Sequence, residues 1–209
     1  MSKVIITVAP TGAFPGKKEN PNVPLTPKEI AADVYECWKA GASIAHLHMR
    51  DDEGKGTMNK NKFRETVEII RSQCDIVLNL TTSGDLHATE ETRMEHLIEL
   101  KPELASYDAG SMNWMHSGLF LNPPQFLEKL GYTMQENNVK PEIEIFDAGM
   151  VYNALYYLKK GVLKAPLHFQ FVLGAAGGTA ATVENLVYLK SLIPQDSTWS
   201  ALGIGSGHL

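Results

Sequence analysis

The chain has 209 residues, of which 44% are hydrophobic and 21% are charged, with a formal net charge of −5. The composition excludes a disordered, collagen-like or disulfide-stapled chain. The scattered Lys and Arg residues argue against a nucleic-acid partner, and no apolar run approaches the ~18–20 residues of a membrane span. We therefore expect neither partner. Cys37 and Cys74 lie at the tails of separate predicted helices and the N-terminus lacks a cleavage site, which predicts a cytoplasmic protein with reduced thiols.

Strand-like and helix-like segments alternate along the chain. The predicted strands cover residues 4–9, 43–49, 75–80, 104–108, 142–146, 167–173 and 198–204. The first predicted helix begins at the Thr26 cap, with Pro27 in its first turn, and stops at Gly41. The other predicted helices cover residues 60–73, 90–100, 124–137, 150–160 and 182–192.

This alternation predicts an α/β fold with a parallel sheet, either doubly wound or closed as a (β/α)8 TIM barrel. Polar clusters after most strands favour the barrel, which builds its site from many strand ends. A barrel has eight strands and typically ~250 residues, whereas this chain has seven predicted strands. We therefore expect residues 1–209 to be a single barrel domain that lacks a C-terminal helix–strand–helix segment of roughly 60 residues. An open seven-stranded sheet is the alternative.

Two histidines, His46 and His48, end the second predicted strand. Residues i and i+2 of a strand share a face, so both imidazoles are expected to point into the barrel mouth. That arrangement suits Zn²⁺ or another divalent ion, although two hydrogen-bonded core histidines would produce the same pattern. A further ligand is needed. The candidates are a residue of the missing segment or, within the chain, Glu142, Glu144, His168 and His208.

Small hydroxyl residues and glycine follow the third predicted strand, at Thr81, Thr82, Ser83 and Gly84. They are candidates for a cradle around a substrate carboxylate, or for a cap on the next helix. Ser106 and Asp108 lie in the second half of the fourth predicted strand. Each is expected either to line the pocket or to cap a loop.

Two carboxylates, Glu142 and Glu144, alternate along the fifth predicted strand and should share its interior face. Buried acids are costly unless they are paired or bound to a cation, so both are functional candidates. An ion pair with a buried Arg or Lys is the alternative.

A glycine-rich loop, residues 174–179, precedes the last predicted helix. Such a loop can hold a phosphate of coenzyme A at a helix N-terminus, but a tight strand-to-helix turn needs the same glycines. The GxGxxG spacing and the Walker Lys are both absent from the loop.

Several short motifs are distributed along the whole chain. They begin with Thr11-Gly12-Ala13, Leu25-Thr26-Pro27 and the segment from Gly41 through His46-Leu47-His48 to Arg50. They continue with Leu80-Thr81-Thr82, Lys101 to Ser106, Gly149-Met150, His168 to Gly174, Thr198-Trp199 and Gly203-Ile204-Gly205. In this combination and order, the motifs resemble those of the β-keto acid cleavage enzyme family.

The resemblance implies a (β/α)8 barrel with a divalent metal, usually zinc, that condenses a β-keto acid with acetyl-CoA. The products would be acetoacetate and a new CoA ester. His46 and His48 match the family's metal histidines, and the family's third ligand is a Glu beyond Leu209. Thr81, Gly84 and Ser106 fall at family positions that contact the substrate.

Two positions depart from the family pattern. Phe14 stands where an amine-accepting member has Glu, which predicts a substrate that is neutral or apolar at that end. Ser206 stands where the family often has an Arg that positions the substrate.

We accordingly expect an enzyme in which Glu144 and Asp108 are catalytic and His46 and His48 bind Zn²⁺ or another divalent metal. Phe14, Thr81, Thr82, Gly84 and Ser106 would bind the substrate. A homo-oligomer, a tetramer, is expected. The alternatives are a metal-dependent aldolase or hydrolase on the same barrel, and a ligand-binding barrel without catalysis.

Overall fold

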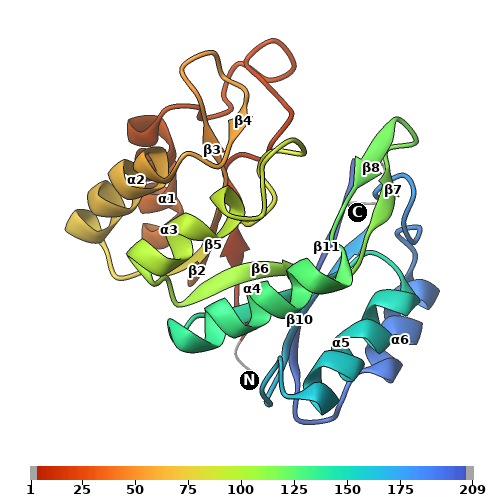
Figure 1. Ribbon diagram of the computed structural model, residues 1–209. Helices are drawn as coiled ribbons and strands as arrows, with labels where there is room; N and C mark the ends of the chain where they lie inside the picture. Colours follow the sequence, from red (N-terminus) through yellow and green to blue (C-terminus); the bar gives the residue numbers. More distant parts are fainter. Residues whose placement is uncertain (1–3, 206–209) are drawn as a thin grey trace. The chain divides into compact units, whose positions relative to one another are not determined.

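The computed structural model describes residues 4–205, in which helices follow strands along the chain (Figure 1). The helices are α1 (Pro27–Lys39), α2 (Lys60–Gln73), α3 (Thr92–Leu100), α4 (Pro124–Glu136), α5 (Ala148–Lys160) and α6 (Val183–Leu192). The parallel strands are β1 (Thr7–Val8), β2 (Ile44–Leu47), β5 (Val77–Leu80), β6 (Leu104–Asp108), β9 (Lys140–Ile145), β10 (His168–Leu173) and β11 (Thr198–Gly203). Across residues 4–205, none of these helices combines the length and apolarity that crossing a bilayer requires.

The chain divides into two compact units, and the boundary falls within β6. Unit one is residues up to Ala105 together with Asn137–Val139, and unit two is Ser106–Glu136 together with the residues from Lys140 onward. In unit one, β1 pairs with β2, β2 with β5, and β5 with the start of β6. In unit two, β9 pairs with β10 and β10 with β11, while Ala109 N donates to Glu144 O at 3.2 Å.

Within each unit, the order of the parallel strands follows the order of the chain. A doubly wound sheet reverses its strand order at a switch point, whereas a barrel does not. The predicted α/β class with parallel strands is thus confirmed, and neither unit contains the reversal that the doubly wound alternative needs.

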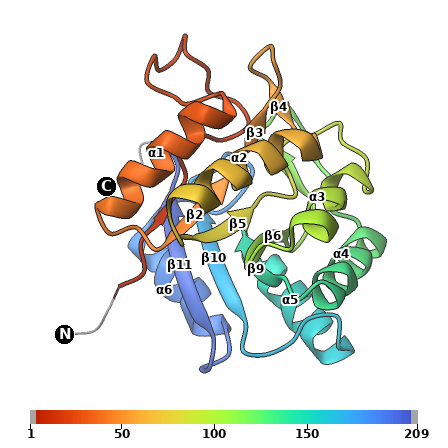
Figure 2. The ribbon, with the colours of Figure 1, turned by 90° about the vertical axis from the view of Figure 1, so that its left-hand side faces the viewer.

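Helix α1 begins as its sequence predicts, with a capping box. Thr26 Oγ1 accepts a hydrogen bond from Glu29 N at 3.2 Å, and Glu29 Oε2 accepts one from Thr26 N at 3.1 Å. The two contacts satisfy backbone donors that the first helical turn leaves without partners. The buried face of α1 carries Ile30, Ala31 and Val34, and α1 lies beside α2 (Figure 2).

The first strand is shorter than predicted. Strand β1 covers only Thr7–Val8, and the side chains of Val4, Ile5 and Ile6 are 80%, 60% and 55% exposed. Branched apolar residues favour a strand only where a neighbouring strand and a packed layer receive them, which is why the pattern alone overestimated this element.

Two short antiparallel hairpins lie outside the predicted elements, apart from Met49, which ends the second predicted strand. The first pairs β3 (Met49–Arg50) with β4 (Gly56–Thr57), and the second pairs β7 (Met112–Trp114) with β8 (Gly118–Phe120). Because β2 ends at Leu47, His48 lies between β2 and β3, so the predicted strand over residues 43–49 is too long. Strands of two or three residues carry too little periodicity to be recognised from sequence.

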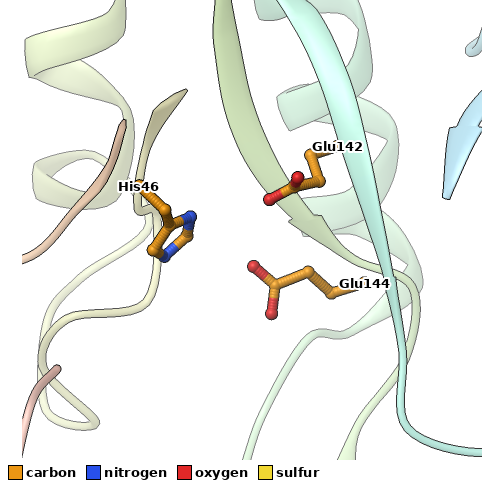
Figure 3. Close-up of side chains that lie close together, drawn as sticks. All are labelled: His46, Glu142 and Glu144. Carbon is orange, nitrogen blue, oxygen red and sulfur yellow. The ribbon is translucent and has the colours of Figure 1, made fainter. Parts of the chain in front are cut away.

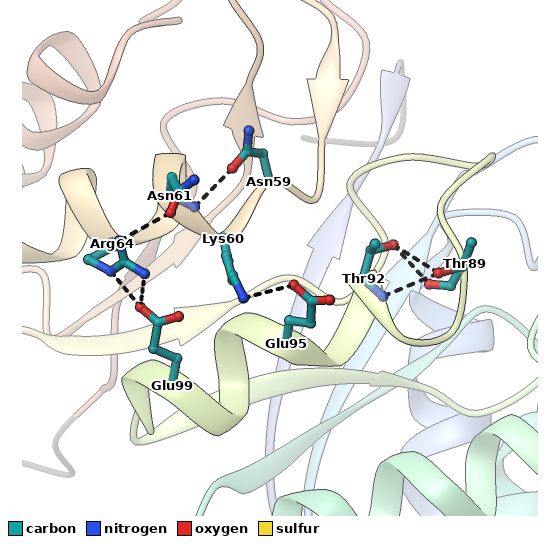
Figure 4. A network of polar contacts seen from close by, with 8 residues as sticks. All are labelled: Asn59, Lys60, Asn61, Arg64, Thr89, Thr92, Glu95 and Glu99. Carbon is teal, nitrogen blue, oxygen red and sulfur yellow. Dashed lines mark hydrogen bonds and ion pairs between the residues drawn. The ribbon is translucent and has the colours of Figure 1, made fainter.

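Helices α2 and α3 are joined at the surface by polar contacts (Figure 4). Lys60 Nζ lies 3.3 Å from Glu95 Oε2, and Arg64 pairs with Glu99. Exposed ion pairs of this kind contribute at most ~1 kcal/mol, so packing of the buried apolar side chains supplies most of the stability here. Phe63 and Leu97 are such side chains.

His96 on α3 is buried in the same packing layer. Its Nε2 donates to the Thr81 carbonyl oxygen at 2.9 Å, and its ring stacks on Phe63 with centroids 4.1 Å apart. Burial lowers the pKa of His96 to about 4, although the hydrogen bond to Thr81 acts in the opposite direction. The histidine is therefore neutral in the folded protein at physiological pH.

We predict that the free energy of unfolding falls as the pH drops from about 6.5 towards 4, because unfolded His96 then binds a proton that the folded protein excludes. The lost stability is on the order of 3 kcal/mol, at ~1.4 kcal/mol per pKa unit. His96→Gln can still donate to Thr81 O but does not titrate, so its urea-unfolding free energy should change less over this range. An identical pH dependence in both proteins would contradict the prediction.

Candidate active site

The histidine pair lies at the carboxyl end of β2 in unit one. The rings of His46 and His48 have centroids 5.1 Å apart and planes inclined by 49°, so they do not lie on opposite faces. Within the described part of the chain, His48 Nδ1 is buried and has no hydrogen-bond partner. A core histidine is normally satisfied through both nitrogens, so the geometry of His48 fits a missing ligand better than the core alternative.

His48 is neutral at physiological pH. Burial, followed by the charges of His46 and Arg50, lowers its pKa well below the ordinary value. A metal requires the neutral imidazole, because a protonated ring has no lone pair to offer. The histidine is thus already in the state that coordinates a cation.

The loop after β5 is held by its own side chains and by two buried donors. Ser83 N donates to Thr81 Oγ1 at 3.1 Å, so Thr81 caps its own loop. His96 Nε2 donates to Thr81 O, and Arg93 Nε donates to Thr82 O at 2.6 Å. Thr81 and Thr82 are completely buried. The alternative of a cap on the next helix is wrong, because the N-cap residue of α3 is Glu91, which makes no side-chain capping hydrogen bond. Contact of this loop with a substrate remains a prediction.

Three loops of unit one pack together around Gly56. A Cβ atom added to Gly56 would lie 2.2 Å from Gly84 O and 3.1 Å from Ala13 O, so only glycine fits. Gly84 N also donates to Met58 Sδ at 3.2 Å. Phe14, which follows Ala13, has a 60% exposed side chain. The structure thus brings the predicted substrate residues Phe14 and Gly84 into one loop cluster and leaves the Phe14 ring accessible.

Unit two contains a buried acidic cluster. Ser106 and Asp108 lie on β6, Glu142 and Glu144 lie on β9, and the exposed fraction of each side chain is 9% or less. The carboxylates of Glu142 and Glu144 project from the same side of β9 (Figure 3), as their alternation predicts.

The carboxylates of this cluster influence one another. Burial raises the pKa of Glu144 well above its ordinary value, and the charges of Asp108 and Glu142 raise it further, while the Ser106 hydroxyl acts in the opposite direction. Glu142 Oε2 lies 3.5 Å from His168 Nε2, and His168 Nδ1 lies 2.9 Å from Thr198 Oγ1. A described partner of Glu142 is therefore a histidine rather than the Arg or Lys of the alternative.

The described residues include three buried side chains of the kinds that ligate metals, His46 in unit one and the carboxylates of Glu142 and Glu144 in unit two, and Figure 3 draws all three. Imidazole nitrogen and carboxylate oxygen are ligands that Zn²⁺ accepts. Buried like charges are costly without a counter-charge, so a divalent cation would suit the carboxylate pair of unit two. Of the other positions considered from sequence, Ser206 and His208 lie outside the described residues.

The glycine-rich loop after β10 is a tight turn in unit two. A Cβ atom on Gly177, whose φ is +95°, would lie 1.8 Å from Asn113 O. Gly174 N donates to Thr179 O at 2.8 Å, and Thr179 N donates to Phe146 O at 2.7 Å. Close packing against the β7–β8 hairpin thus accounts for the glycine at 177, and no phosphate is needed to explain it.

Arg50 is the buried side chain whose role the sequence left unassigned. Its exposed fraction is 2%, and it donates to the loop that carries Phe14. The signal in the sequence is an Arg two residues after His48, in a chain whose Gly- and Pro-rich loop over residues 10–24 has carbonyl groups that need donors.

Fold and site together define an α/β protein with polar side chains at the ends of parallel strands. Residues 3–209 match the family model for β-keto acid cleavage enzymes. The 3-keto-5-aminohexanoate cleavage enzyme of Fusobacterium nucleatum subsp. nucleatum is 41% identical over 98% of the chain and 75% of that protein. The 3-oxoadipate:acetyl-CoA acetyltransferase of Cupriavidus necator is 34% identical over 98% of the chain and 72% of that protein. The chain belongs to the β-keto acid cleavage enzyme family.

Solved structures agree on the fold. ObcA, in a ternary complex with C4-CoA adduct and oxalate, superposes with a TM-score of 0.73 at 20% sequence identity. The match covers 87% of this chain and 52% of the ObcA chain. The chain thus spans about three quarters of its curated relatives and about half of ObcA.

We predict that Glu144→Gln stabilises the metal-free protein near neutral pH. Because the folded pKa of Glu144 is raised, its carboxylate costs stability once the pH exceeds its unfolded pKa, and the neutral amide removes that cost. In EDTA, the melting temperature of the variant should exceed that of the wild type at pH 7.5 and converge with it below pH 4.

The matched control is Glu184→Gln, which replaces an exposed carboxylate on α6. It should leave the melting temperature unchanged at both pH values. A Glu144→Gln protein that melts below the wild type in EDTA at pH 7.5 would show that the carboxylate is satisfied without a cation.

Proposed function

We propose that the protein condenses a β-keto acid with acetyl-CoA, giving acetoacetate and a new CoA ester. The supporting observation is the family match over residues 3–209, which includes the neighbouring histidines His46 and His48 and the buried acids Asp108 and Glu144. In this reaction the carbon between the two carbonyl groups of the keto acid attacks the thioester carbonyl and releases the CoA thiol. The thiol then attacks the original keto carbon, and the bond from that carbon to the attacking carbon breaks.

The complete protein would be a (β/α)8 barrel with a divalent metal, zinc or another ion. His46 and His48 would supply nitrogen ligands, and a carboxylate oxygen would be a further ligand. When bound, the ion would act as a Lewis acid on the keto oxygen. The support lies in the chemistry of the donors: His48 is neutral with its Nδ1 buried, and Glu142 and Glu144 are buried carboxylates.

The residues of the acidic cluster would move the proton. Glu144, with Asp108 beside it, would accept the proton lost from the attacking carbon, and its raised pKa makes its carboxylate a stronger base than an exposed glutamate. The Ser106 hydroxyl and the loop at Thr81, Thr82 and Gly84 would orient the keto acid. Orientation of two reactants accounts for a large part of such a rate enhancement.

The cellular location of the protein and its oligomeric state are also proposals. The free thiols of Cys37 and Cys74 support a cytoplasmic location, where thiols stay reduced.

Exposed apolar side chains on α5 and α6, such as Tyr156 and Val187, support a homo-oligomer. We propose that this homo-oligomer is a tetramer, and sedimentation velocity would measure its size.

We predict that His46→Ala or His48→Ala removes the bound metal from the full-length protein. Each variant should lose at least ~10-fold in metal affinity and in acetoacetate formation, since even loss of a supporting group near a metal costs 10–100-fold. Metal analysis after dialysis and an acetoacetate assay over a panel of β-keto acids are the measurements. His87→Ala, in the loop before α3, is the control and should retain both. Full metal content in either site variant would overturn the metal assignment.

We predict that Phe14 disfavours a substrate with a cationic amine at the end remote from the carboxylate. An aromatic face offers a cation ~0.5–1 kcal/mol, whereas a charge-assisted hydrogen bond contributes ~1.5–3 kcal/mol. The wild type should therefore prefer 3-oxohexanoate to 3-keto-5-aminohexanoate by ~10-fold or more in kcat/KM. Phe14→Glu should gain activity on the amine. Phe14→Gln should not, because the glutamine side chain has the length of glutamate but no charge. A wild-type preference for the amine would contradict the prediction.

A further inference from the structure

The buried guanidinium of Arg50 joins two loops of unit one. Its Nε donates to Gly12 O at 2.7 Å, and its Nη2 donates to Pro15 O at 2.7 Å and to Thr11 Oγ1 at 3.3 Å. Its Nη1 donates to Gly54 O at 2.8 Å, in the turn between β3 and β4. One side chain therefore ties the loop after β1, residues 11–15, to the first hairpin.

Only an arginine can make this set of contacts. The acceptors lie in different directions around a planar group, and three of them are backbone carbonyl oxygens that no substitution removes. A lysine ammonium keeps the charge, but it is a single nitrogen and cannot span acceptors on both loops. Asp51, the adjacent acid, accepts from Glu53 N and Lys55 N within its own turn.

The tethered loop is the one that carries Phe14. Gly12 and Pro15 flank that residue and are both fixed by Arg50, while the Phe14 ring stays 60% exposed. The neighbouring Ala13 packs against Gly56, which also touches Gly84. The position of Phe14 relative to Gly84 thus depends on how firmly residues 11–15 are held to the hairpin.

We propose that Arg50 is a positioning residue that sets substrate selectivity by fixing the loop that presents Phe14. This inference rests on the proposed function, because it takes Phe14 to face the end of the β-keto acid remote from its carboxylate. Arg50 itself touches no reacting atom in this role. Its effect should appear in KM and in the choice between substrates, with kcat nearly unchanged.

The test compares the full-length wild type with Arg50→Lys and Arg50→Met, and uses Arg64→Lys as the control. Arg64 is a half-exposed arginine on α2 that pairs with Glu99 outside this loop cluster. Hydrogen–deuterium exchange of a peptide covering residues 11–16 reports the tether. The ratio of kcat/KM for 3-oxohexanoate to that for 3-keto-5-aminohexanoate reports selectivity, and metal analysis reports the histidine pair.

In both Arg50 variants we expect exchange over residues 11–16 to quicken by ~10-fold or more, since local opening controls exchange. KM should rise at least ~5-fold, and the selectivity ratio should move towards one by ~5-fold, if about 1 kcal/mol of discrimination is lost. Metal content should stay the same. Arg50→Lys, the milder change, should lie between Arg50→Met and the wild type, and Arg64→Lys should match the wild type throughout.

Unchanged exchange in both Arg50 variants would overturn the tether, whatever the activity. Faster exchange with an unchanged selectivity ratio would overturn the specificity role. A wild type that converts no β-keto acid would refute the proposed function and the specificity role together, while the exchange data would still decide whether Arg50 holds the loop.

Discussion

The cost of burying like charges is the constraint on which the candidate site depends. Asp108 on β6 and Glu142 and Glu144 on β9 are almost fully removed from solvent, and their mutual repulsion adds to the desolvation of Glu144. A protein meets this cost with a proton, a hydrogen-bonding partner or a cation. In unit two, the pKa of Glu144 is raised, which favours the protonated carboxyl, and His168 Nε2 lies 3.5 Å from Glu142 Oε2. The same groups can move a proton or bind a metal, so the feature that costs stability is also the source of the proposed chemistry.

A second theme, in unit one, is the use of buried donors to hold loop backbones. Arg93 and His96 donate to the carbonyl groups of Thr82 and Thr81, and Arg50 donates to three further carbonyl groups in the loops on either side of it. Loops that are fixed in this way can present side chains with the precision that selectivity requires. The donors that hold these loops are buried, whereas the side chain of Phe14, on the loop after β1, is exposed.

Family members differ in the substrates that their names specify, yet the fold persists down to the 20% identity shared with ObcA. Strand order and the buried faces of the helices depend on patterns that many sequences satisfy. A short exposed loop can change with little effect on those patterns. Phe14 lies on such an exposed loop, and Arg50 holds the backbone on either side of it at Gly12 and Pro15.

The sequence by itself determined the α/β class, the capping box of α1, the alternation of Glu142 and Glu144, and the candidate ligands His46 and His48. These follow from local periodicity and from residue chemistry, which need no knowledge of distant contacts. Only the tertiary structure decided that β1 is short, that Met49 and Arg50 form one strand of a hairpin with β4, and that the glycine-rich loop is a packed turn. It also decided that Arg50 binds the carbonyl groups around Phe14. Those outcomes depend on partners tens of residues away, whose positions no local pattern encodes.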